Sequence, residues 1–191
     1  MKPKEQQKEN PEIASNRDTF QTPNYAIDLL IPFIPKDIEK IWECAVGDWK
    51  IGNRLIESGY SVLGTDIRLL DTRTKEHNFL LTSSIYSYPN SMIITNPPFS
   101  IKRQFYEKCL EYNIPFALLI PADYSGWIIE AIQNGAEKII PTRRIDYITP
   151  TGLKGKSSAS AFHSMWLTKG LNLGKTETFV ELTNEEKRNN I

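Results

Sequence analysis

Short apolar runs alternate with segments of helical periodicity along most of this chain, and this alternation constrains the fold more than any other feature. The runs that resemble buried strands cover residues 40–46, 60–67, 91–95, 115–121, 137–140 and 162–168. The helical segments cover residues 25–34, 50–59, 100–113 and 127–135. Strands that alternate with helices in this way form parallel βαβ units. We therefore expect a single-domain α/β fold, with a Rossmann-like, doubly wound, mostly parallel sheet that binds its ligands at the carboxyl ends of the strands.

Polar segments mark the limits of this domain. Residues 1–17 are charged and lack periodicity, so we expect a disordered N-terminal arm. The domain should cover residues 18–172, and residues 173–191 are predicted to be a polar C-terminal tail. Residues 141–161 are basic and rich in Gly, Ser and Thr, which predicts a long basic loop. Ser100 is the predicted N-cap of the helical segment that follows it.

The composition narrows the class of protein. The chain has 191 residues, 40% of them apolar, which is enough for one core. Its 23 basic and 23 acidic residues balance, so nucleic-acid binding would need a local patch. No apolar run approaches the roughly 20 residues of a membrane helix, and the N-terminal residues lack the apolar stretch of a secretory signal. We expect a cytoplasmic protein without membrane contact. Cys44, Cys109, His77 and His163 are too few and too far apart to predict a metal site.

Residues 40–67 combine a strand, a glycine turn, a helix and a second strand that ends in an acid. Gly47 lies in the turn, and Asp66 follows it by 19 residues. This spacing is typical of a nucleotide-binding βαβ unit, in which the acid binds ribose hydroxyls. Glu43 precedes the turn, and two acids at strand ends suit a ligand with an amino group and a ribose better than a pyrophosphate. The alternative is a plain turn between a strand and a helix.

Trp49 stands at the third position of the glycine motif, where a second glycine is usual. A side chain at this position takes up space, and a left-handed backbone at a non-glycine residue costs about 1–2 kcal/mol. A penalty of about 1.4 kcal/mol would weaken cofactor binding about tenfold. Trp49 therefore supports a rival interpretation, in which the chain is a binding protein that no longer holds a cofactor.

Asn96, Pro97, Pro98 and Phe99 follow directly after the apolar run 91–95. The side-chain oxygen of Asn96 and the carbonyl of Pro97 can both accept a hydrogen bond from an exocyclic amino group, which favours the pyramidal, nucleophilic geometry of that amine. The prolines fix φ and remove competing N–H donors. Phe99 can stack on the ring that carries the amine. The alternative is a turn that ends the strand, because Asn-Pro is a common breaker.

Together these residues resemble the S-adenosylmethionine-dependent amino-methyltransferases, which methylate N6 of adenine, N4 of cytosine or a glutamine amide. The family's [DNS]-P-P-[YFW] motif matches residues 96–99 at every position. Its acid and glycine turn match Glu43 and Gly47 but not Trp49, and its second acid matches Asp66. The order of the motifs is that of the adenine-N6 group. Small phage-type DNA adenine methyltransferases resemble the chain most in size and in the kind of motifs they carry.

Two further segments extend the resemblance over roughly residues 18–168. F-Q-T-P is similar to the family's F-x-T-P element, which packs on the methionine end of the cofactor. N-F-L is similar to its Asp-Phe-Leu segment, which contacts the cofactor adenine, with Asn in place of Asp. The additional cofactor contacts that the resemblance implies are Phe20, Thr22, Pro23, Asn78 and Phe79. It also implies the class I methyltransferase fold, S-adenosylmethionine as the cofactor, and no metal.

The implied reaction is transfer of a methyl group to the N6 amine of adenine in DNA, with the base flipped out of a duplex. RNA adenine or a glutamine amide would fit the same pocket chemistry. Only about 90 residues follow N-P-P-F, which leaves no separate recognition domain, so a homodimer or a partner subunit could supply recognition.

The remaining candidate for substrate binding is the basic segment 143–160. The residues expected to contact phosphates are Arg143, Arg144, Lys154 and Lys156, and Tyr147 is expected to stack on a base. Lys102 and Arg103, after the pocket, are further candidates for a backbone contact. The alternative is a basic surface that only contacts solvent.

Overall fold

The computed structural model describes residues 21–81, 89–148 and 162–189. The α-helices are α1 (Asn24–Asp28), α2 (Lys50–Glu57), α3 (Lys102–Tyr112), α4 (Gly126–Gln133) and α5 (Asn184–Asn189), and the 3₁₀ turns are η2 (Ile31–Phe33) and η3 (Phe99–Ile101). The strands are β1 (Lys40–Glu43), β2 (Ser61–Asp66), β3 (Lys75–Glu76), β4 (Ser91–Thr95), β5 (Phe116–Pro121), β6 (Glu137–Pro141), β7 (Ser164–Lys169) and β8 (Glu177–Val180).

The strands form one sheet in the order β3-β2-β1-β4-β5-β7-β6-β8. Neighbours pair in parallel except around β7, which is antiparallel to both β5 and β6. The chain therefore starts in the middle of the sheet at β1, moves outward to β3, and then returns through β4 to build the other half. The prediction of a doubly wound, mostly parallel sheet is confirmed.

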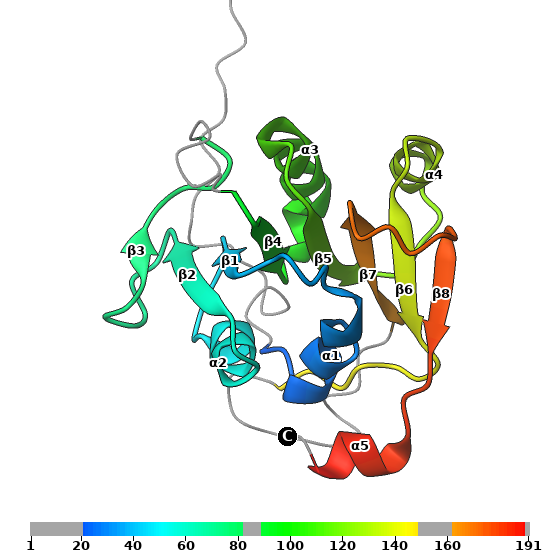
Figure 1. Ribbon diagram of the computed structural model, residues 1–191, viewed down its shortest axis with the longest axis horizontal. Coiled ribbons are helices and arrows are strands. Elements are labelled where there is room, and N and C mark those ends of the chain that lie inside the picture. The colour runs from blue at the N-terminus through cyan, green and yellow to red at the C-terminus, as the bar shows by residue number, and fades with distance from the viewer. Residues whose placement is uncertain (1–20, 82–88, 149–161, 190–191) are drawn as a thin grey trace, which may run out of the picture.

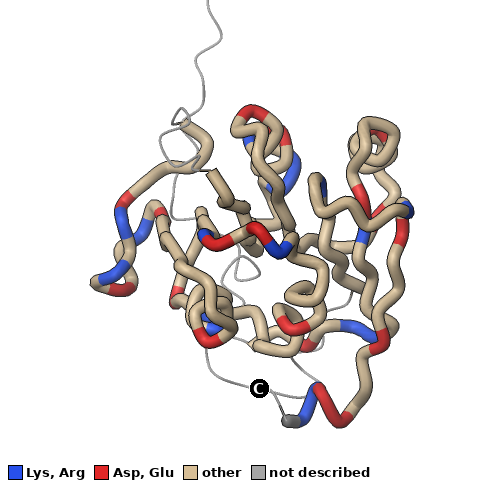
Figure 2. The backbone as a smooth tube through the Cα atoms, viewed as in Figure 1, with Lys and Arg blue, Asp and Glu red and all other residues tan. Residues whose placement is uncertain are grey.

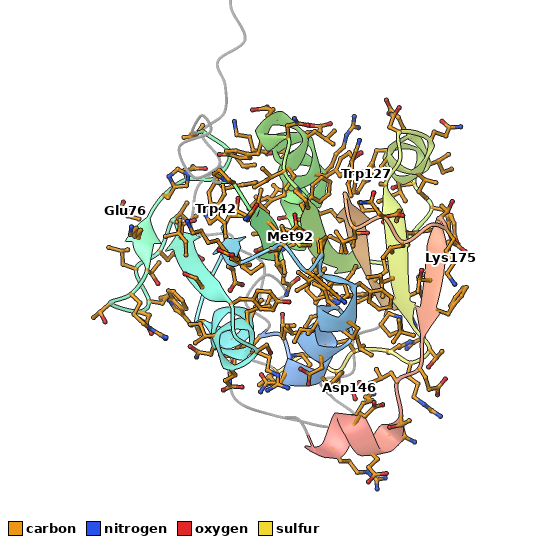
Figure 3. All side chains as sticks on the ribbon, viewed as in Figure 1. Trp42, Glu76, Met92, Trp127, Asp146 and Lys175 are labelled. Carbon is orange, nitrogen blue, oxygen red and sulfur yellow. The ribbon has the colours of Figure 1, made fainter. Side chains whose placement is uncertain are left out.

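Helices cover both faces of the sheet, with α1 and α2 below it and α3 and α4 above it in Figure 1. Each layer of helices has its own core. The lower core contains Met92 and the buried apolar residues of α1 and α2, whereas the upper core contains Trp42 and the buried apolar residues of α3 and α4. Both side chains are labelled in Figure 3. β4 and β5 are buried on both faces, and their central residues are accordingly consecutive apolar side chains rather than an alternation of apolar and polar ones.

Helix α1 is short, and contacts with distant parts of the chain hold it in place. The indole N–H of Trp166 in β7 donates a hydrogen bond to the Ala26 carbonyl at 2.9 Å. The Tyr25 hydroxyl accepts the Asp146 backbone N–H at 2.7 Å. The Asp146 carboxylate in turn pairs with Lys187 of α5 at 2.5 Å. The first and last described helices are therefore tied to the same segment.

The structure differs from the sequence-based expectation at two helix and strand boundaries. The predicted N-cap at Ser100 is wrong, because residues 99–101 form a 3₁₀ turn and α3 begins only at Lys102, with Ile101 at its N-cap position. Part of the expected polar tail, residues 177–180, is the edge strand β8, which pairs in parallel with β6. The buried side chain of Leu182 then packs into the lower core before α5 begins. None of the described helices is long and apolar enough to cross a membrane.

Candidate active site

Three polar side chains lie at the carboxyl ends of neighbouring strands. Glu43 ends β1, Asp66 ends β2, and Asn96 directly follows β4. The register places Trp42 of β1 beside Leu63 of β2 and Ile93 of β4, so the three strand ends come to the same edge of the sheet. The sequence predicted these three residues from separate motifs, and parallel pairing brings them to one edge.

The turn after β1 is tied to the end of β2 through Asp66. The backbone N–H of Gly47, whose φ is 51°, donates to Asp66 Oδ2 at 3.0 Å. The other carboxylate oxygen accepts the Arg68 backbone N–H at 2.9 Å. Asp66 is buried, and both hydrogen bonds to its charged form are of the strong, charge-assisted kind. Asp66 therefore shapes the glycine turn itself, a role that spacing alone did not reveal.

Trp49 adopts the left-handed backbone that a glycine would take, with φ 66° and ψ 16°. Its ring is only 3% exposed and fills a slot between α2 and β2. Glycines line this slot: a Cβ at Gly52 would lie 2.7 Å from Trp49 Cε3, and a Cβ at Gly64 would lie 2.7 Å from Trp49 Cη2. The indole N–H donates to Thr74 Oγ1 at 2.9 Å, and the Arg73 guanidinium stacks 4.3 Å from the ring centroid. The side chain thus occupies space provided by two glycines rather than the end of the turn.

Glu43 is buried with an incomplete set of hydrogen bonds. Its side chain is 2% exposed, and Oε2 has no hydrogen-bond partner among the described residues. Burial raises the pKa of Glu43 well above its ordinary value, the Gly52 N–H partly offsets this, and the carboxylates of Asp48 and Asp66 raise it further. A buried polar atom without a partner is costly and rare in a native fold, so this oxygen is suited to receive a donor from a ligand.

Asn96 shows the same pattern, one residue beyond β4. Its Nδ2 donates to Thr22 Oγ1 at 3.1 Å, across 74 residues of sequence. Its Oδ1 is buried and accepts no hydrogen bond from any residue that the structure describes. The F-Q-T-P and N-P-P-F segments are therefore in direct contact. The sequence named both segments but gave no sign of this contact between them.

Phe99 packs at the other end of N-P-P-F. Its half-buried ring meets Tyr147 edge-on at a centroid distance of 6.1 Å and Phe162 at 5.4 Å. Pro97 is buried, and Pro98 is half-buried before the 3₁₀ turn. The two aromatic neighbours hold the Phe99 ring in place. Its stacking against a substrate base stays a prediction.

The N-F-L segment lies next to Asp66, whose carbonyl accepts the His77 backbone N–H at 2.9 Å. Asn78 is exposed, and its Oδ1 accepts the Leu80 N–H at 3.1 Å. The Phe79 ring is buried in the upper core, stacked on Phe105 at 4.9 Å. Any ligand contact from Phe79 would therefore come from its backbone, while its ring anchors the segment.

The candidates for nucleic-acid binding have different surroundings. Arg143 and Arg144 are exposed. The prediction that Tyr147 stacks on a base is wrong, because its side chain is buried and its hydroxyl donates to Ser164 Oγ at 2.9 Å. Residues 145, 147 and 148, in the first part of the predicted loop 141–161, are buried. Phe20, Lys154 and Lys156 lie outside the described residues.

The basic residues after the pocket are paired with acids. Lys102 Nζ lies 3.7 Å from Asp123 Oδ2, and Arg103 Nε lies 2.8 Å from Glu107 Oε1. Lys and Arg are interspersed with Asp and Glu over much of the chain, including the region around β3 (Figure 2). Within the described ranges, no group of three or more His, Cys, Asp or Glu residues is placed to hold a metal ion.

A cavity of about 470 Å³ lies elsewhere on the sheet. Its lining includes Lys40, Ser61 and Ser91, the first residues of β1, β2 and β4, and it extends along β2 to the Trp49 ring. Because it includes the starts of these strands, it is separate from the edge that carries Glu43, Asp66 and Asn96. We do not assign it to the candidate site.

The sequence matches no protein-family model and no curated protein. Among solved structures, a candidate RNA methyltransferase from Pyrococcus horikoshii aligns with a TM-score of 0.57 at 15% identity, covering 84% of this chain and 89% of that one. The methyltransferase subunit of a type I restriction-modification system from Streptococcus thermophilus aligns with a TM-score of 0.58 at 11% identity, covering 89% of this chain but 52% of that one. The 23S rRNA methyltransferase ErmE gives 0.51 at 11% identity, covering 88% and 74%. The chain has the fold of the class I methyltransferase type.

Proposed function

We propose that this protein is an S-adenosylmethionine-dependent methyltransferase that acts on the N6 amine of adenine in DNA. The observation that carries the proposal is the buried Asn96 Oδ1, which has no hydrogen-bond partner within the described residues and follows β4 in a fold of the class I methyltransferase type. An acceptor held in this way is suited to a planar amine. The order of the sequence motifs supports adenine as the base.

The cofactor site in this proposal surrounds the carboxyl ends of β1 and β2. Glu43 offers an unpartnered, buried carboxylate oxygen to the amino group of the cofactor, and Asp66 retains acceptor capacity for ribose hydroxyls. Gly47 keeps the turn open for close approach of the ligand because it lacks a side chain. The remaining cofactor contacts in the proposal are Phe20, Thr22, Pro23, Asn78 and the backbone of Phe79. Trp49 leaves room for this site because its ring is enclosed between α2 and β2.

The residues of N-P-P-F orient the amine in this mechanism. Bound S-adenosylmethionine supplies an electrophilic methyl group on a sulfonium. Asn96 Oδ1 and the Pro97 carbonyl would accept hydrogen bonds from the two N–H groups of the amine, which would leave the nitrogen lone pair available to the methyl group. Transfer of this methyl group would form the C–N bond as the C–S bond of the cofactor breaks, with the electron pair of that bond left on sulfur. Asn96 is no base at neutral pH, so the amine proton leaves to water. Phe99 and Pro98 limit the movement of the base.

Substrate contacts outside the pocket are assigned to basic residues. Arg143 and Arg144 are exposed beside a segment that Tyr25 and Lys187 hold in place through Asp146. With Lys154 and Lys156 they would bind phosphates, and a homodimer or partner subunit would complete recognition. The proposal places the reaction in the cytoplasm, or in the host cytoplasm if the protein is encoded by a phage.

The proposal is tested by mass spectrometry of nucleosides and protein hydrolysates from cells that express the wild type or Asn96→Ala. N6-methyladenine should rise in DNA with the wild type and stay at background with Asn96→Ala. A rise in RNA alone, or in methylglutamine alone, would replace DNA with that substrate. Absence of all three products would refute the activity.

Calorimetry with S-adenosylmethionine separates an enzyme from a non-catalytic relative. The wild type should bind the cofactor, because the Trp49 ring lies in its own slot. Absence of binding at millimolar concentration, with binding restored in Trp49→Gly, would establish the rival interpretation of a degenerate fold that acts only as a binding protein.

A further inference from the structure

Strand β8 is the last strand at one end of the sheet, and its outer edge is open among the described strands. It lies at the right-hand limit of the sheet in Figure 1. The carbonyls of Thr176 and Val180 both accept hydrogen bonds from the segment that contains β6, at 2.8 Å. Because successive residues of a strand turn their backbone groups to opposite sides, the backbone groups of Glu177 and Phe179 point to the open edge.

The upper face of this edge carries two exposed aromatic rings. Phe179 lies beside Ile140 of β6, which packs on the upper core, and is 66% exposed. On the same face, Glu177 pairs with Lys138 and accepts the Tyr124 hydroxyl at 3.0 Å, and Tyr124 is 68% exposed. Aromatic side chains are enriched in protein–protein interfaces, and an open strand edge can pair with a strand of another chain.

The lower face of the same edge carries Thr178, whose hydroxyl has an incomplete set of hydrogen bonds. Thr178 lies beside Ile139 of the lower core and is 8% exposed. Its Oγ1 is buried and has no hydrogen-bond partner among the residues that the structure describes, which is costly for a polar atom. Rotation about χ1 can turn this hydroxyl to the open edge, where it can donate or accept a hydrogen bond.

We propose that a second copy of this chain pairs with β8 in an antiparallel ladder whose two-fold axis passes through Thr178. In this register each Thr178 faces its counterpart, so one hydroxyl can donate to the other across the ladder. Lys175 lies opposite Glu181 of the second copy, and the symmetry repeats this pair at the other end of the ladder. Both side chains are exposed in the single chain, so the dimer brings together opposite charges that each chain leaves in solvent.

The order of charges along the strand favours a second copy over an unrelated strand. The segment has Lys175 at one end and Glu181 at the other, so it is complementary to its own reversed copy. Phe179 then lies opposite Glu177 of the second copy, which the exposed Tyr124 ring accompanies. A shift of the axis to Phe179 would instead place Glu177 opposite Glu181, and like charges directly opposite each other are destabilising.

The interface lies far from the candidate active site. β4, which Asn96 follows, is four strands away from β8 in the sheet, or roughly 19 Å. The dimer therefore leaves each candidate site within its own chain, and it does not depend on the proposed function. Additional recognition of the substrate would then come from a different protein subunit rather than from this second copy.

Analytical ultracentrifugation of the full chain, without cofactor or nucleic acid, tests the interface. The wild type should sediment as a dimer, with twice the 21.9 kDa mass of one chain. Lys175→Glu and Glu181→Lys each create two pairs of like charges in the ladder, so each should raise the dimer Kd by about tenfold. The double variant exchanges the charges and should return the Kd to within about threefold of wild type. Lys36→Glu is the matched control, because Lys36 is exposed before β1 and should leave the Kd unchanged.

Disulfide cross-linking tests the register, with oxidised glutathione as the oxidant. Thr178→Cys places a thiol opposite its own counterpart, at a Cα separation of about 4.5 Å, which a disulfide can span. Val180→Cys is the matched control on the same face, because its two copies would lie roughly 14 Å apart. The native Cys44 and Cys109 are buried. Covalent dimers should therefore form with Thr178→Cys and stay at the wild-type background with Val180→Cys.

Three results would overturn the proposal. One is a wild type that stays a monomer at roughly 100 μM, where even a weak complex forms in part. Another is a dimer whose Kd does not change in the single charge variants or is not restored in the double variant, which would place the interface on another face. The third is cross-linking of Val180→Cys as readily as of Thr178→Cys. Methyl transfer enters none of these measurements, so failure of the proposed activity and failure of the dimer are distinguishable.

Discussion

Replacing Gly64 with alanine tests how Trp49 is accommodated. The new Cβ would lie 2.7 Å from Trp49 Cη2, whereas carbon atoms in contact prefer about 3.5–4.0 Å. The ring would have to move by roughly 1 Å. It cannot do so freely, because its N–H is bonded to Thr74 and its backbone forms the start of α2.

The expected cost can be worked out from these contacts. Overpacking a filled core costs about 1–3 kcal/mol, and replacing a strand glycine with alanine returns about 0.5–1 kcal/mol. A contact as short as 2.7 Å places the overpacking cost in the upper part of this range, so the net loss of stability for Gly64→Ala should be about 1–2 kcal/mol. In a chain of 191 residues, this corresponds to a fall in Tm of about 2–8 °C.

The assay is urea and thermal unfolding of four proteins: wild type, Gly64→Ala, Trp49→Gly and the double variant. Trp49→Gly empties the slot, so Gly64→Ala should be neutral or stabilising in that background. The coupling free energy should be about 2 kcal/mol. Gly126→Ala is the control, since a Cβ there meets nothing within 4 Å, and its stability should stay the same or rise by up to about 1 kcal/mol.

Two results would refute this account of the slot. One is a Gly64→Ala variant as stable as the wild type. The other is an equal destabilisation by Gly64→Ala with and without the Trp49 ring. Either would mean that the ring does not depend on the absence of a side chain at Gly64.

Three further variants test the electrostatics of the site. Burial raises the pKa of Glu43 above its ordinary value of 4.5, so the stability that its protonated form contributes is lost as pH rises above 4.5. The wild type should therefore lose stability as the pH rises, whereas Glu43→Gln, which cannot ionise at this position, should not. The difference between the unfolding free energies of Glu43→Gln and wild type, measured in urea, should increase in favour of Glu43→Gln as the pH rises above 4.5. Asp66→Asn weakens two charge-assisted hydrogen bonds, and calorimetric unfolding should show a loss of about 1–3 kcal/mol. Arg143→Ala should weaken DNA binding for all sequences alike and reduce the salt slope by about 1, whereas binding by the control Arg188→Ala should stay unchanged.

The alternation of apolar runs and helical segments predicted the architecture because it reflects burial, which acts over every residue of a strand. It did not predict β3 or β8. β3 has only the two polar residues Lys75 and Glu76. β8 is an edge strand with an exposed Phe179, so neither carries the apolar run that marks a buried strand. Edge strands need less burial, and their sequences carry a weaker signal for that reason.

The features of the candidate site also differ in whether the sequence alone could predict them. Glu43, Asp66 and Asn96 could be predicted because strand ends and turn residues leave local marks in the sequence. The contact between Thr22 and Asn96 spans 74 residues and leaves no such mark. The sequence did contain a sign of the slot for Trp49, because Gly64 interrupts a strand. A glycine inside a strand often indicates that another part of the protein approaches the backbone closely at that point. Its connection to Trp49 depends on how α2 packs on β2, which only the three-dimensional structure gives.

The anchoring of α1 has a consequence for the order in which the protein folds during its synthesis. The segment that contacts Asn96 is made before the strands of the sheet, and its anchor Trp166 lies 140 residues beyond Ala26. A nascent chain can pair β1, β2 and β4 while α1 is still undocked. We therefore expect the contact between Thr22 and Asn96 to form stably after β7 has left the ribosome and docked on the sheet.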